Sequence, residues 1–464
     1  MKVFGCSSPD TVLDVSRRAR EVAIVVSVLT VIVLLGTFTS RPVSASTPVS
    51  GRAAAIQVTP AAGLYDQARS IVISHLSAGE VVNVTARTAR PNGTWSANAT
   101  FKANQSGVVD LARDAPLSGS YRGVSAMGLF WAQHQTGPGS APLNGRTVTT
   151  LTVAKGTKRL ASTQATQLLE GKGVTERAER VGKVGFYGEY FTPAGTTRRP
   201  AVVLWGGSEG GLATASWAAL LASHGIPTLA LAYFDEPGLP CALSNIPLEY
   251  FEKAIRWLRL QPQVDPGRVW VMSGSRGSEA ALLVASYSGS LVHGVVADAP
   301  SSDVYGPLPG TCAPTEPGSS WTYQGIPLAA ATEDAADVLH NHDGSLSFAP
   351  AFLSGLPDTA RDAQIPTGRI KGPVLLISGG DDQLWPSNTY ADRIMASLHD
   401  DPSVHVHLNY PAAGHFVLGP PYVPTLNEER YGKNEVLALG GTNAAYDAAH
   451  QRDWPATITF VTTH

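Results

Sequence analysis

The sequence is short of charge, and the little charge that it has is nearly balanced. Only 15% of its 464 residues are Asp, Glu, Lys or Arg, and the formal net charge is -3. Proteins that bind the phosphates of nucleic acids usually carry a clear basic excess. We therefore expect no nucleic-acid partner. Hydrophobic residues make up 43% of the chain, which is enough for sizeable cores, and the length favours two or three domains.

Cysteine is scarce as well, with three residues in the whole chain. Cys6 has no lipoprotein-type apolar box before it, so we assign it no role. Residues 53–154 hold no cluster of His, Cys or carboxylates of the kind that binds a metal. The glycine-rich stretch Gly206–Gly211 lacks the Lys-Ser/Thr of a phosphate-binding loop. The sequence thus points to chemistry that needs neither a metal nor a cofactor.

The N-terminus is unlike the rest of the chain. The run Val22–Phe38 is interrupted only by Ser, Thr and Gly, arginines precede it, and Pro42-Val-Ser-Ala45 follows it. This pattern is typical of a secretory signal peptide cleaved after Ala45. An uncleaved anchor is the alternative, because the run approaches the length that spans a bilayer. We expect residues 1–45 to be a signal peptide or membrane anchor. The protein would then be exported, either secreted or in the cell envelope, or be membrane-associated through residues 22–38.

Residues 46–154 have the pattern of an all-β domain. Val82, Val84 and Ala86 alternate with polar residues, which is the period of a half-buried strand. Short strands separated by turn signals favour a β-sandwich. Residues 155–181 are polar and predict a linker. The other predicted strands of this domain are Ser70–His75, Trp95–Lys102, Gly107–Ala112, Ala126–Gln133 and Thr147–Val153.

Residues 182–464 alternate between apolar strands and amphipathic helices. One predicted helix carries Trp217, Leu220 and Leu221 on one face, and a second predicted helix has an apolar face that begins at Leu248. This alternation predicts a mostly parallel sheet with helices on both faces, with its chemistry at the carboxyl ends of the strands. The predicted strands are Ala201–Trp205, Thr228–Tyr233, Arg268–Met272, His293–Asp298, Val374–Ser378 and Val404–Asn409.

Ser275 lies at the sharpest of these strand ends, in Ser273-Gly-Ser-Arg-Gly277. A serine between small residues, after a strand and before a helix, is the pattern of a nucleophile elbow. The usual motif is Gly-x-Ser-x-Gly, and here a serine replaces its first glycine. A glycine-rich turn without chemistry is the alternative reading of this motif alone.

Three other strand ends carry residues that fit the same chemistry. The glycine-rich loop after Trp205 can point backbone N–H groups into a site, as an oxyanion hole requires. The pair Asp381-Asp382 follows one later strand, and His415 follows the next. Ser, then Asp, then His is the chain order of an α/β-hydrolase triad. Since an isolated Asp or His is usually only a loop residue, the agreement of all three carries the prediction.

These motifs resemble the acyl-CoA thioesterase and bile-acid-CoA:amino-acid N-acyltransferase family, in its bacterial form. The resemblance runs from about Ile56 to the C-terminus. The similar stretches are Ser106–Arg113, Gly119–Trp131, Gly206-Gly-Ser-Glu-Gly-Gly-Leu212, Leu229-Ala-Leu-Ala-Tyr-Phe234, Gly379-Gly-Asp-Asp-Gln-Leu-Trp-Pro-Ser387, Tyr410-Pro-Ala-Ala-Gly-His415 and Pro420-Pro-Tyr-Val-Pro424. It implies an α/β-hydrolase fold preceded by an immunoglobulin-like sandwich.

The resemblance also implies roles for individual residues. Ser275 would be the nucleophile, His415 the base and Asp382 the acid, with the adjacent Asp381 structural. The backbone N–H groups of Arg276 and of the Gly207–Ser208 region would hold the oxyanion. The chain departs from the family in two ways. It has serine where the amino-acid acyltransferases have cysteine, and it carries an export signal, although familiar members work inside cells.

The expected activity is hydrolysis of an acyl thioester through an acyl-serine intermediate. Three alternatives stay open. The first is an exported carboxylesterase or lactone hydrolase, and the second is an acyl-CoA:amino-acid N-acyltransferase. The third is a non-catalytic binding protein that retains the hydrolase fold as a scaffold.

Cys241 and Cys312 are the only cysteines left after removal of residues 1–45. An even pair in an exported protein indicates a disulfide, and two unrelated thiols are the alternative. Both residues lie in loops after predicted strands, at the edge of the sheet where the site is expected. A disulfide between them would restrain the mouth of the site.

Overall fold

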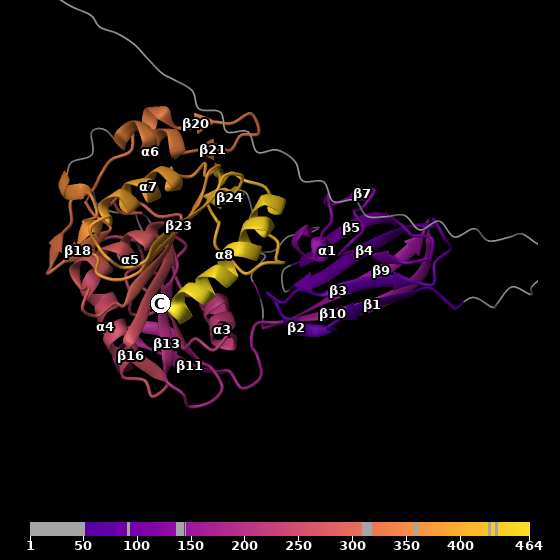
Figure 1. The fold of residues 1–464 in the computed structure, drawn as a ribbon. Coiled ribbons are helices and arrows are strands. Elements are labelled where there is room, and N and C mark those ends of the chain that lie inside the picture. The colour runs from indigo at the N-terminus through magenta and orange to yellow at the C-terminus, as the bar shows by residue number, and fades with distance from the viewer. Residues whose placement is uncertain are drawn as a thin grey trace, which may run out of the picture. The chain divides into compact units, whose positions relative to one another are not determined.

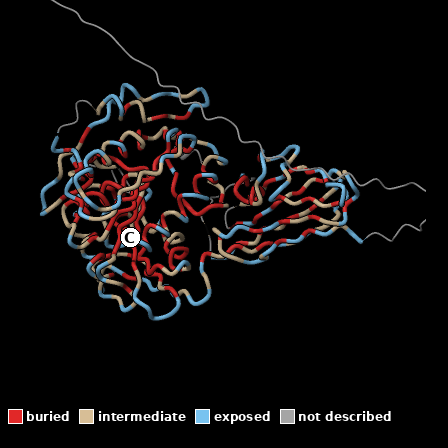
Figure 2. The backbone as a smooth tube through the Cα atoms, in the orientation of Figure 1, coloured by how far each residue is buried: buried red, intermediate tan, exposed pale blue. Residues whose placement is uncertain are grey.

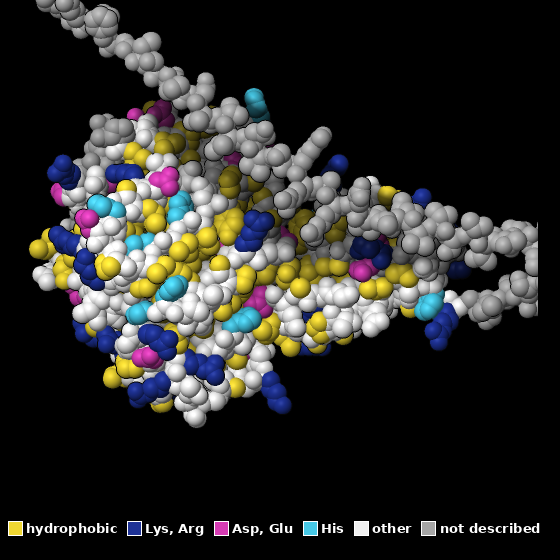
Figure 3. Space-filling model, in the orientation of Figure 1, with side chains coloured by type: hydrophobic (Ala, Val, Ile, Leu, Met, Phe, Trp, Pro, Cys, Tyr) yellow, Lys and Arg dark blue, Asp and Glu magenta, His cyan; other side chains and the backbone are white. Residues whose placement is uncertain are grey.

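The computed structural model describes residues 52–90, 93–135, 143, 145–308, 318–356, 361–425, 428–431 and 435–464. Residues 1–45, with the predicted signal peptide or anchor, lie outside these ranges. Within them, no helix combines the length and the apolar character needed to cross a membrane. Figure 1 shows strands and the short helix α1 up to β10, followed by strands and helices in alternation. Lys and Arg side chains lie scattered among uncharged ones on the face shown in Figure 3.

The N-terminal part consists of two β-sheets that share one apolar core. One sheet has the order β1-β3-β6 and the other the order β2-β10-β9-β4-β5-β7, with β8 beside β5. Along β4, Val82, Val84 and Ala86 point into this core, as their alternation predicts. The strands are β1 (Ala55–Thr59), β2 (Ala62–Leu64), β3 (Ser70–Ser74), β4 (Val81–Arg90), β5 (Gly93–Lys102), β6 (Val109–Asp110), β7 (Ser118–Gly119), β8 (His134–Gln135), β9 (Arg146–Lys155) and β10 (Lys158–Leu168).

The strand predicted over Ala126–Gln133 is wrong. Gly128–Trp131 form the short helix α1, whose four residues are all buried. The ring of Tyr121 packs so closely on Gly128 that a Cβ there would overlap it. An apolar run of this length is compatible with either a buried strand or a buried helix, and the contact with Tyr121 is not visible in the sequence.

The linker predicted over residues 155–181 is also wrong. Most of this stretch is regular, because β10 pairs with β9 from Lys158↔Lys155 to Leu168↔Arg146, and β11 (Thr175–Glu179) begins the next sheet. Both strands have largely exposed or half-buried side chains. Their polar composition therefore reflects exposure to solvent, and it hides the strand pattern.

The C-terminal part is built on an eight-stranded sheet. Its order is β11-β12-β14-β13-β16-β17-β22-β23. Neighbours from β14 to β23 are parallel, and β12 is antiparallel to both of its neighbours. This is the mostly parallel sheet expected of an α/β-hydrolase. The remaining strands are β12 (Tyr187–Thr192), β13 (Arg199–Trp205), β14 (Thr228–Ala232), β16 (Val264–Gly274), β17 (Gly294–Asp298), β22 (Val374–Gly379) and β23 (His405–Tyr410).

Helices cover both faces of this sheet. The core on one face includes residues of α4 (Leu248–Arg259), α5 (Arg276–Tyr287) and α7 (Ser387–Ser397). The core on the other face includes residues of α3 (Ala215–Ser223) and α8 (Asn443–Thr463). The central strands are therefore buried on both sides, which Figure 2 shows as a red centre, and their apolar sequences follow from this burial.

Smaller elements lie between the main strands in the chain. They form a three-stranded sheet, β15-β18-β19, and a four-stranded sheet, β20-β21-β25-β24, neither of which the sequence predicted. Their bounds are β15 (Ile246–Pro247), β18 (Trp321–Tyr323), β19 (Ile326–Pro327), β20 (Leu339–His340), β21 (Leu346–Ser347), β24 (Glu428–Tyr431) and β25 (Glu435–Ala438), with helices α2 (Val181–Val184), α6 (Ala349–Gly355), η1 (Ala335–Asp337), η3 (Arg361–Ala363) and η4 (Thr367–Arg369).

Candidate active site

Ser275 lies between the end of β16 and the first residue of α5, with backbone angles φ 53° and ψ -131°. Residues with a Cβ rarely adopt this conformation, so the surrounding structure must hold it. Two contacts do so: the Ser275 N–H donates to Asp298 O at 3.0 Å, and Ser278 N–H donates to Ser275 O at 2.9 Å. Strained backbone of this kind is often found at functional sites.

The small residues around Ser275 are required by close packing. A Cβ on Gly277 would overlap Gly206 O and Ser273 Oγ, so only glycine fits there. Ser273, which replaces the usual first glycine, donates its hydroxyl to Trp205 O at 2.9 Å. The departure from the common motif thus adds a hydrogen bond between the serine turn and the end of β13.

His415 contacts both Ser275 and Asp382. Its Nε2 lies 2.8 Å from Ser275 Oγ, and its Nδ1 lies 3.0 and 3.1 Å from the two carboxylate oxygens of Asp382. A carboxylate only accepts hydrogen bonds, so Nδ1 carries the proton and Nε2 accepts from the Ser275 hydroxyl. His415 and Asp382 are 1% and 8% exposed, so these contacts are shielded from water. The structure therefore brings together the three residues that the sequence predicts.

The two adjacent aspartates after β22 have different partners. Asp382 Oδ1 also accepts from the N–H groups of Leu384 and Trp385, at 3.0 and 3.2 Å, which fixes its carboxylate toward His415. Asp381 is exposed, and its Oδ2 accepts from Gly441 N–H at 2.9 Å. Asp381 thus connects two loops, whereas Asp382 orients the imidazole.

The residues predicted to supply the oxyanion hole lie beside Ser275. Gly207 is next to the serine turn, because a Cβ built on it would lie 3.0 Å from Ser275 Cβ. The hydroxyl of Tyr233 donates to Gly206 O and Gly207 O, which fixes this loop. The N–H of Arg276 is the first of α5, so the helix itself offers it no acceptor. Ser208, the other predicted donor, lies in the same loop and is exposed.

The Arg276 side chain is turned away from Ser275. Its guanidinium donates to Gly306 O at 2.7 Å and pairs with Glu279, which is fully buried. Glu279 also accepts from Trp321 Nε1 at 2.8 Å. Burial raises the pKa of Glu279 to about 7, although the Arg276 charge works in the opposite direction. This cluster joins α5 to residues 305–306 and 320–321, and it engages the side chain of Arg276, the cation next to Ser275 in the sequence.

Asp298, at the end of β17, was not predicted as a site residue. Its backbone carbonyl holds Ser275, and its carboxylate Oδ1 accepts from Leu418 N–H at 3.1 Å, three residues after His415. One residue therefore connects the serine turn to the histidine loop. Burial raises the pKa of Asp298 to about 8. Its position at a parallel-strand end, like those of Ser275, Asp382 and His415, is the signal that could have identified it.

A pocket of about 140 Å³ opens beside Ser275 and His415. Apolar side chains from β13, β16, α3 and the histidine loop form most of its wall. The rest of the wall consists of glycines and polar residues, which include two acidic side chains and no Lys or Arg. The lining residues are Leu204, Trp205, Gly206, Gly207, Glu209, Ala213, Thr214, Trp217, Met272, Ser273, Gly274, Ser275, Asp298, His415, Phe416 and Leu418.

Two other predictions concern cysteine and metals. Cys241 is disulfide-bonded. Its predicted partner, Cys312, lies outside the described residues, so the pairing of Cys241 with Cys312 stays a prediction. No group of three or more His, Cys, Asp or Glu suited to holding a metal ion is found in the described part of the chain.

Comparisons with known proteins cover both parts of the chain. Residues 66–180 match the family model "Acyl-CoA thioester hydrolase/BAAT N-terminal region", and residues 246–464 match "BAAT / Acyl-CoA thioester hydrolase C terminal". Among solved structures, a dienelactone hydrolase-like phosphotriesterase from metagenomic libraries is 19% identical, covers 62% of this chain and 98% of its own, and superposes with a TM-score of 0.38.

Three mouse (Mus musculus) proteins are similar over most of their length. Acyl-coenzyme A thioesterase 6 is 28% identical over 88% of this chain and 96% of its own. Peroxisomal succinyl-coenzyme A thioesterase is 28% identical over 89% of this chain and 97% of its own. Acyl-coenzyme A amino acid N-acyltransferase 1 is 29% identical over 85% of this chain and 94% of its own. With both of its family models matched in order along the sequence, the chain belongs to the acyl-CoA thioester hydrolase/BAAT family.

Proposed function

We propose that this protein hydrolyses acyl-CoA thioesters through an acyl-serine intermediate on Ser275. The observation that carries the proposal is the hydrogen-bonded series from Ser275 Oγ to His415 Nε2 and from His415 Nδ1 to Asp382. This is the arrangement of a serine nucleophile, its general base and the acid that orients the base. Membership of a family of thioester hydrolases supports the choice of substrate.

In the first half of the reaction, Ser275 Oγ attacks the thioester carbonyl while His415 Nε2 takes the hydroxyl proton. The carbonyl oxygen becomes an oxyanion, which the N–H groups of Arg276 and Gly207 stabilise. Removing one such donor typically lowers turnover by about 10²–10³-fold. The C–S bond then breaks, and His415 returns its proton to the departing sulfur. Asp382 stabilises the imidazolium throughout.

In the second half, water replaces the thiol. His415 takes a proton from a water molecule, whose oxygen attacks the acyl-serine carbonyl. The second tetrahedral intermediate collapses, releases the carboxylic acid and restores the Ser275 hydroxyl. Every proton transfer passes through Nε2, which the contact with Asp382 keeps free to accept.

We infer hydrolysis and not transfer to an amino acid, the activity named for one of the relatives. An acyl-serine is an oxygen ester, which is less reactive toward amines than an acyl-cysteine thioester. Serine therefore gives an amine little advantage over water, which is far more concentrated. Oxygen-ester hydrolysis uses the same side chains and is an outcome of the test below.

The test uses purified protein with acyl-CoA thioesters from acetyl to palmitoyl and with the matching p-nitrophenyl esters. Thiol release and free acid are measured, with and without millimolar glycine or taurine. We expect free CoA and free acid in equal amounts. Predominant N-acyl product would assign the protein to the transferases, and hydrolysis of the oxygen esters alone would assign it to the carboxylesterases.

We further propose that the protein is exported and that its all-β part is an immunoglobulin-like sandwich. The charged and apolar pattern of residues 1–45 supports export, and the disulfide at Cys241 is consistent with an oxidising compartment. Terminal sequencing of protein from the producing cell tests export, because a mature chain should begin near Ser46. Comparison of an experimental structure of the all-β part with immunoglobulin domains tests the second proposal.

A further inference from the structure

The pocket beside Ser275 is small and has a fixed back wall. At about 140 Å³, it is close to the roughly 150 Å³ cavity that holds one benzene ring in a well-packed protein. Trp217, in α3, lines it and packs edge-to-face on Trp454 of α8, with ring centroids 5.9 Å apart. Trp454 is itself held by a 2.7 Å hydrogen bond from its Nε1 to Asp66. The indole of Trp217 thus has little freedom to move aside.

No described lining residue is a Lys or Arg. The ionisable lining residues besides His415 are Glu209, which is exposed, and Asp298, whose raised pKa of about 8 keeps it protonated at neutral pH. The guanidinium of Arg276, the nearest cation in the sequence, is held by Glu279 and Gly306. A carboxylate placed in this pocket would lose its water and meet no opposite charge, which costs much free energy. An alkyl group would instead contact Leu204, Met272 and the other apolar side chains of the wall.

Size decides which half of a thioester can occupy the pocket. Coenzyme A, with its nucleotide and pantetheine arm, is many times larger than the pocket, so the thiol side must lead outward. The pocket is therefore left for the acyl side, directly next to Ser275.

We propose that this pocket holds the acyl group and selects short, uncharged acyl chains of about four to six carbon atoms over long-chain and dicarboxylic ones. Trp217 sets the length limit, and Glu209 contributes to the rejection of carboxylates. The proposal rests on the proposed thioesterase function and adds its substrate class.

The length limit is tested with straight-chain acyl-CoA thioesters from acetyl to palmitoyl. One methylene too many in an apolar pocket typically lowers kcat/KM by about tenfold or more, so we expect a maximum between butyryl and hexanoyl and a steep fall beyond it. Trp217→Ala should move this maximum toward longer chains, and the milder Trp217→Leu should move it part of the way. Trp257→Ala, which removes another half-buried indole from aromatic packing on α4, should leave the maximum in place.

The charge preference is tested with butyryl-CoA and succinyl-CoA, which differ by a terminal methyl group against a carboxylate. We expect kcat/KM for butyryl to exceed that for succinyl by about 10²-fold or more, as for other mismatched polar groups in apolar pockets. Glu209→Gln should narrow this ratio by raising the succinyl rate. Glu176→Gln, an exposed carboxylate of β11, should leave it unchanged.

A wild-type maximum at dodecanoyl-CoA or longer, or equal rates with succinyl and butyryl, would overturn the proposal while leaving the thioesterase function intact. An unchanged maximum in both folded Trp217 variants would show that Trp217 does not set the limit. Hydrolysis of no acyl-CoA at any length would instead reject the function itself, and this proposal with it.

Discussion

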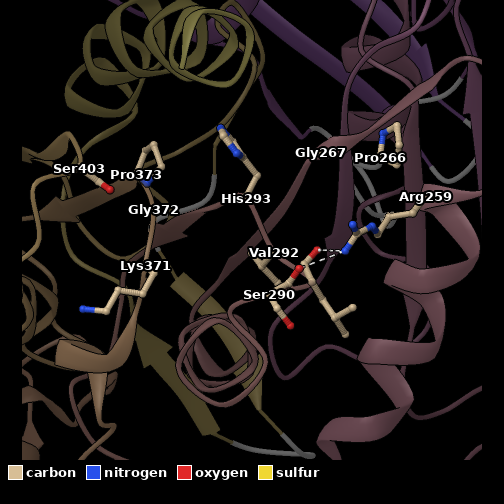
Figure 4. Close-up of a pocket in the computed structure, with 11 residues that line it drawn as sticks. Arg259, Pro266, Gly267, Ser290, Val292, His293, Lys371, Gly372, Pro373 and Ser403 are labelled. Carbon is tan, nitrogen blue, oxygen red and sulfur yellow. Dashed lines mark hydrogen bonds between the residues drawn. The ribbon is translucent and has the colours of Figure 1, made fainter.

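The two edges of the eight-stranded sheet each carry a pocket, and the larger pocket lies at the edge that lacks Ser275. Near the amino ends of β16, β17 and β22, a pocket of about 470 Å³ is lined by Arg259, Pro266, Gly267, Ser290, Leu291, Val292, His293, Lys371, Gly372, Pro373 and Ser403 (Figure 4). The pocket at the carboxyl ends measures about 140 Å³.

The polar groups at the amino edge are engaged by the fold. Arg259 Nη1 donates to the backbone oxygens of Ser290 and Leu291 at 3.1 and 3.5 Å, which Figure 4 draws as dashed lines. His293 Nε2 donates to His464 O at 2.9 Å, and Lys371 pairs with Asp401 at 3.6 Å. These groups stabilise contacts between separate elements of the fold.

At the carboxyl edge, the polar groups converge on one atom instead. Ser275 Oγ lies at 2.8 Å from a histidine that is itself oriented by a carboxylate, and the Ser275 backbone is held in a strained conformation. The comparison shows that convergence of polar groups and backbone strain identify a reactive site better than the volume of a pocket does.

Ser275→Ala should have the largest effect at the carboxyl edge. Loss of a catalytic serine typically lowers kcat by about 10⁴-fold or more. The melting temperature should stay nearly unchanged, because removing a hydroxyl from a turn leaves little cavity. Rates of thiol release and a thermal melt measure both. A folded variant that keeps more than a tenth of the activity would place the chemistry elsewhere.

Asp382→Asn and Asp381→Asn separate catalysis from structure within one loop. An amide at Asp382 can donate to Nδ1 and so favours the wrong imidazole tautomer, which costs about 10⁴-fold in kcat in a comparable triad. Asp381→Asn should cost less than about tenfold, since an amide oxygen can still accept from Gly441 N–H. Equal losses in the two variants would mean that the partners of the two aspartates have been assigned wrongly.

The three residues of this series were predictable because each depends on local sequence. Apolar strands and the turn residues after them mark the strand ends, and parallel strands place these ends at one edge. That rule places Ser275, the pair Asp381-Asp382 and His415 at this edge, and the family resemblance selects Asp382 from the pair. For Arg276, local sequence predicted the role of the backbone N–H at the turn. It did not predict that the guanidinium contacts Glu279 and Gly306.

What the sequence did not predict depends on packing between distant segments. Asp298 matters because Leu418 approaches it from 120 residues away. Trp217 lines the site because α3 and α8 pack on the same face of the sheet. The strand β10 was not predicted because most of its side chains are polar and exposed or half-buried. Its pairing with β9 forms through the backbone and leaves little apolar pattern in the sequence.

The buried acid Asp298 should make stability depend on pH. Its folded pKa of about 8 lies above the ordinary value, so between about pH 4 and pH 8 the folded state holds a proton that the unfolded state has lost. The free energy of unfolding therefore falls as pH rises through this window, by at most about 1.4 kcal/mol per pH unit for one proton. Below pH 6.5, His450, whose pKa burial lowers to about 4, contributes with the opposite sign.

Urea unfolding is measured between pH 6.5 and pH 8, where the opposing contribution of His450 is over. Asp298→Asn keeps an acceptor for Leu418 N–H and cannot ionise, so its slope should be flatter than that of the wild type. Glu279, whose raised pKa of about 7 contributes with the same sign as Asp298, is present in both proteins, so the difference between the two slopes reports Asp298. Identical slopes would show that Asp298 is already ionised in the folded protein at neutral pH.

The smallest effect on activity is expected at the amino edge. Lys371→Ala and His293→Ala should change kcat/KM by less than about twofold, in line with substitutions away from a site. His293→Ala removes the contact with His464 and should lower the unfolding midpoint slightly. A large loss of activity from either variant, with the fold intact, would contradict the assignment of this pocket to structure alone.

The most direct measurement is rapid-quench mass spectrometry of the enzyme during turnover of butyryl-CoA. The acyl-serine mechanism predicts a transient increase in protein mass by one acyl group, located on the peptide that contains Ser275. The increase should be absent in Ser275→Ala. The adduct should decay to free acid at the same rate when glycine is present. Full turnover without an adduct, or an adduct on another residue, would contradict the acyl-serine mechanism.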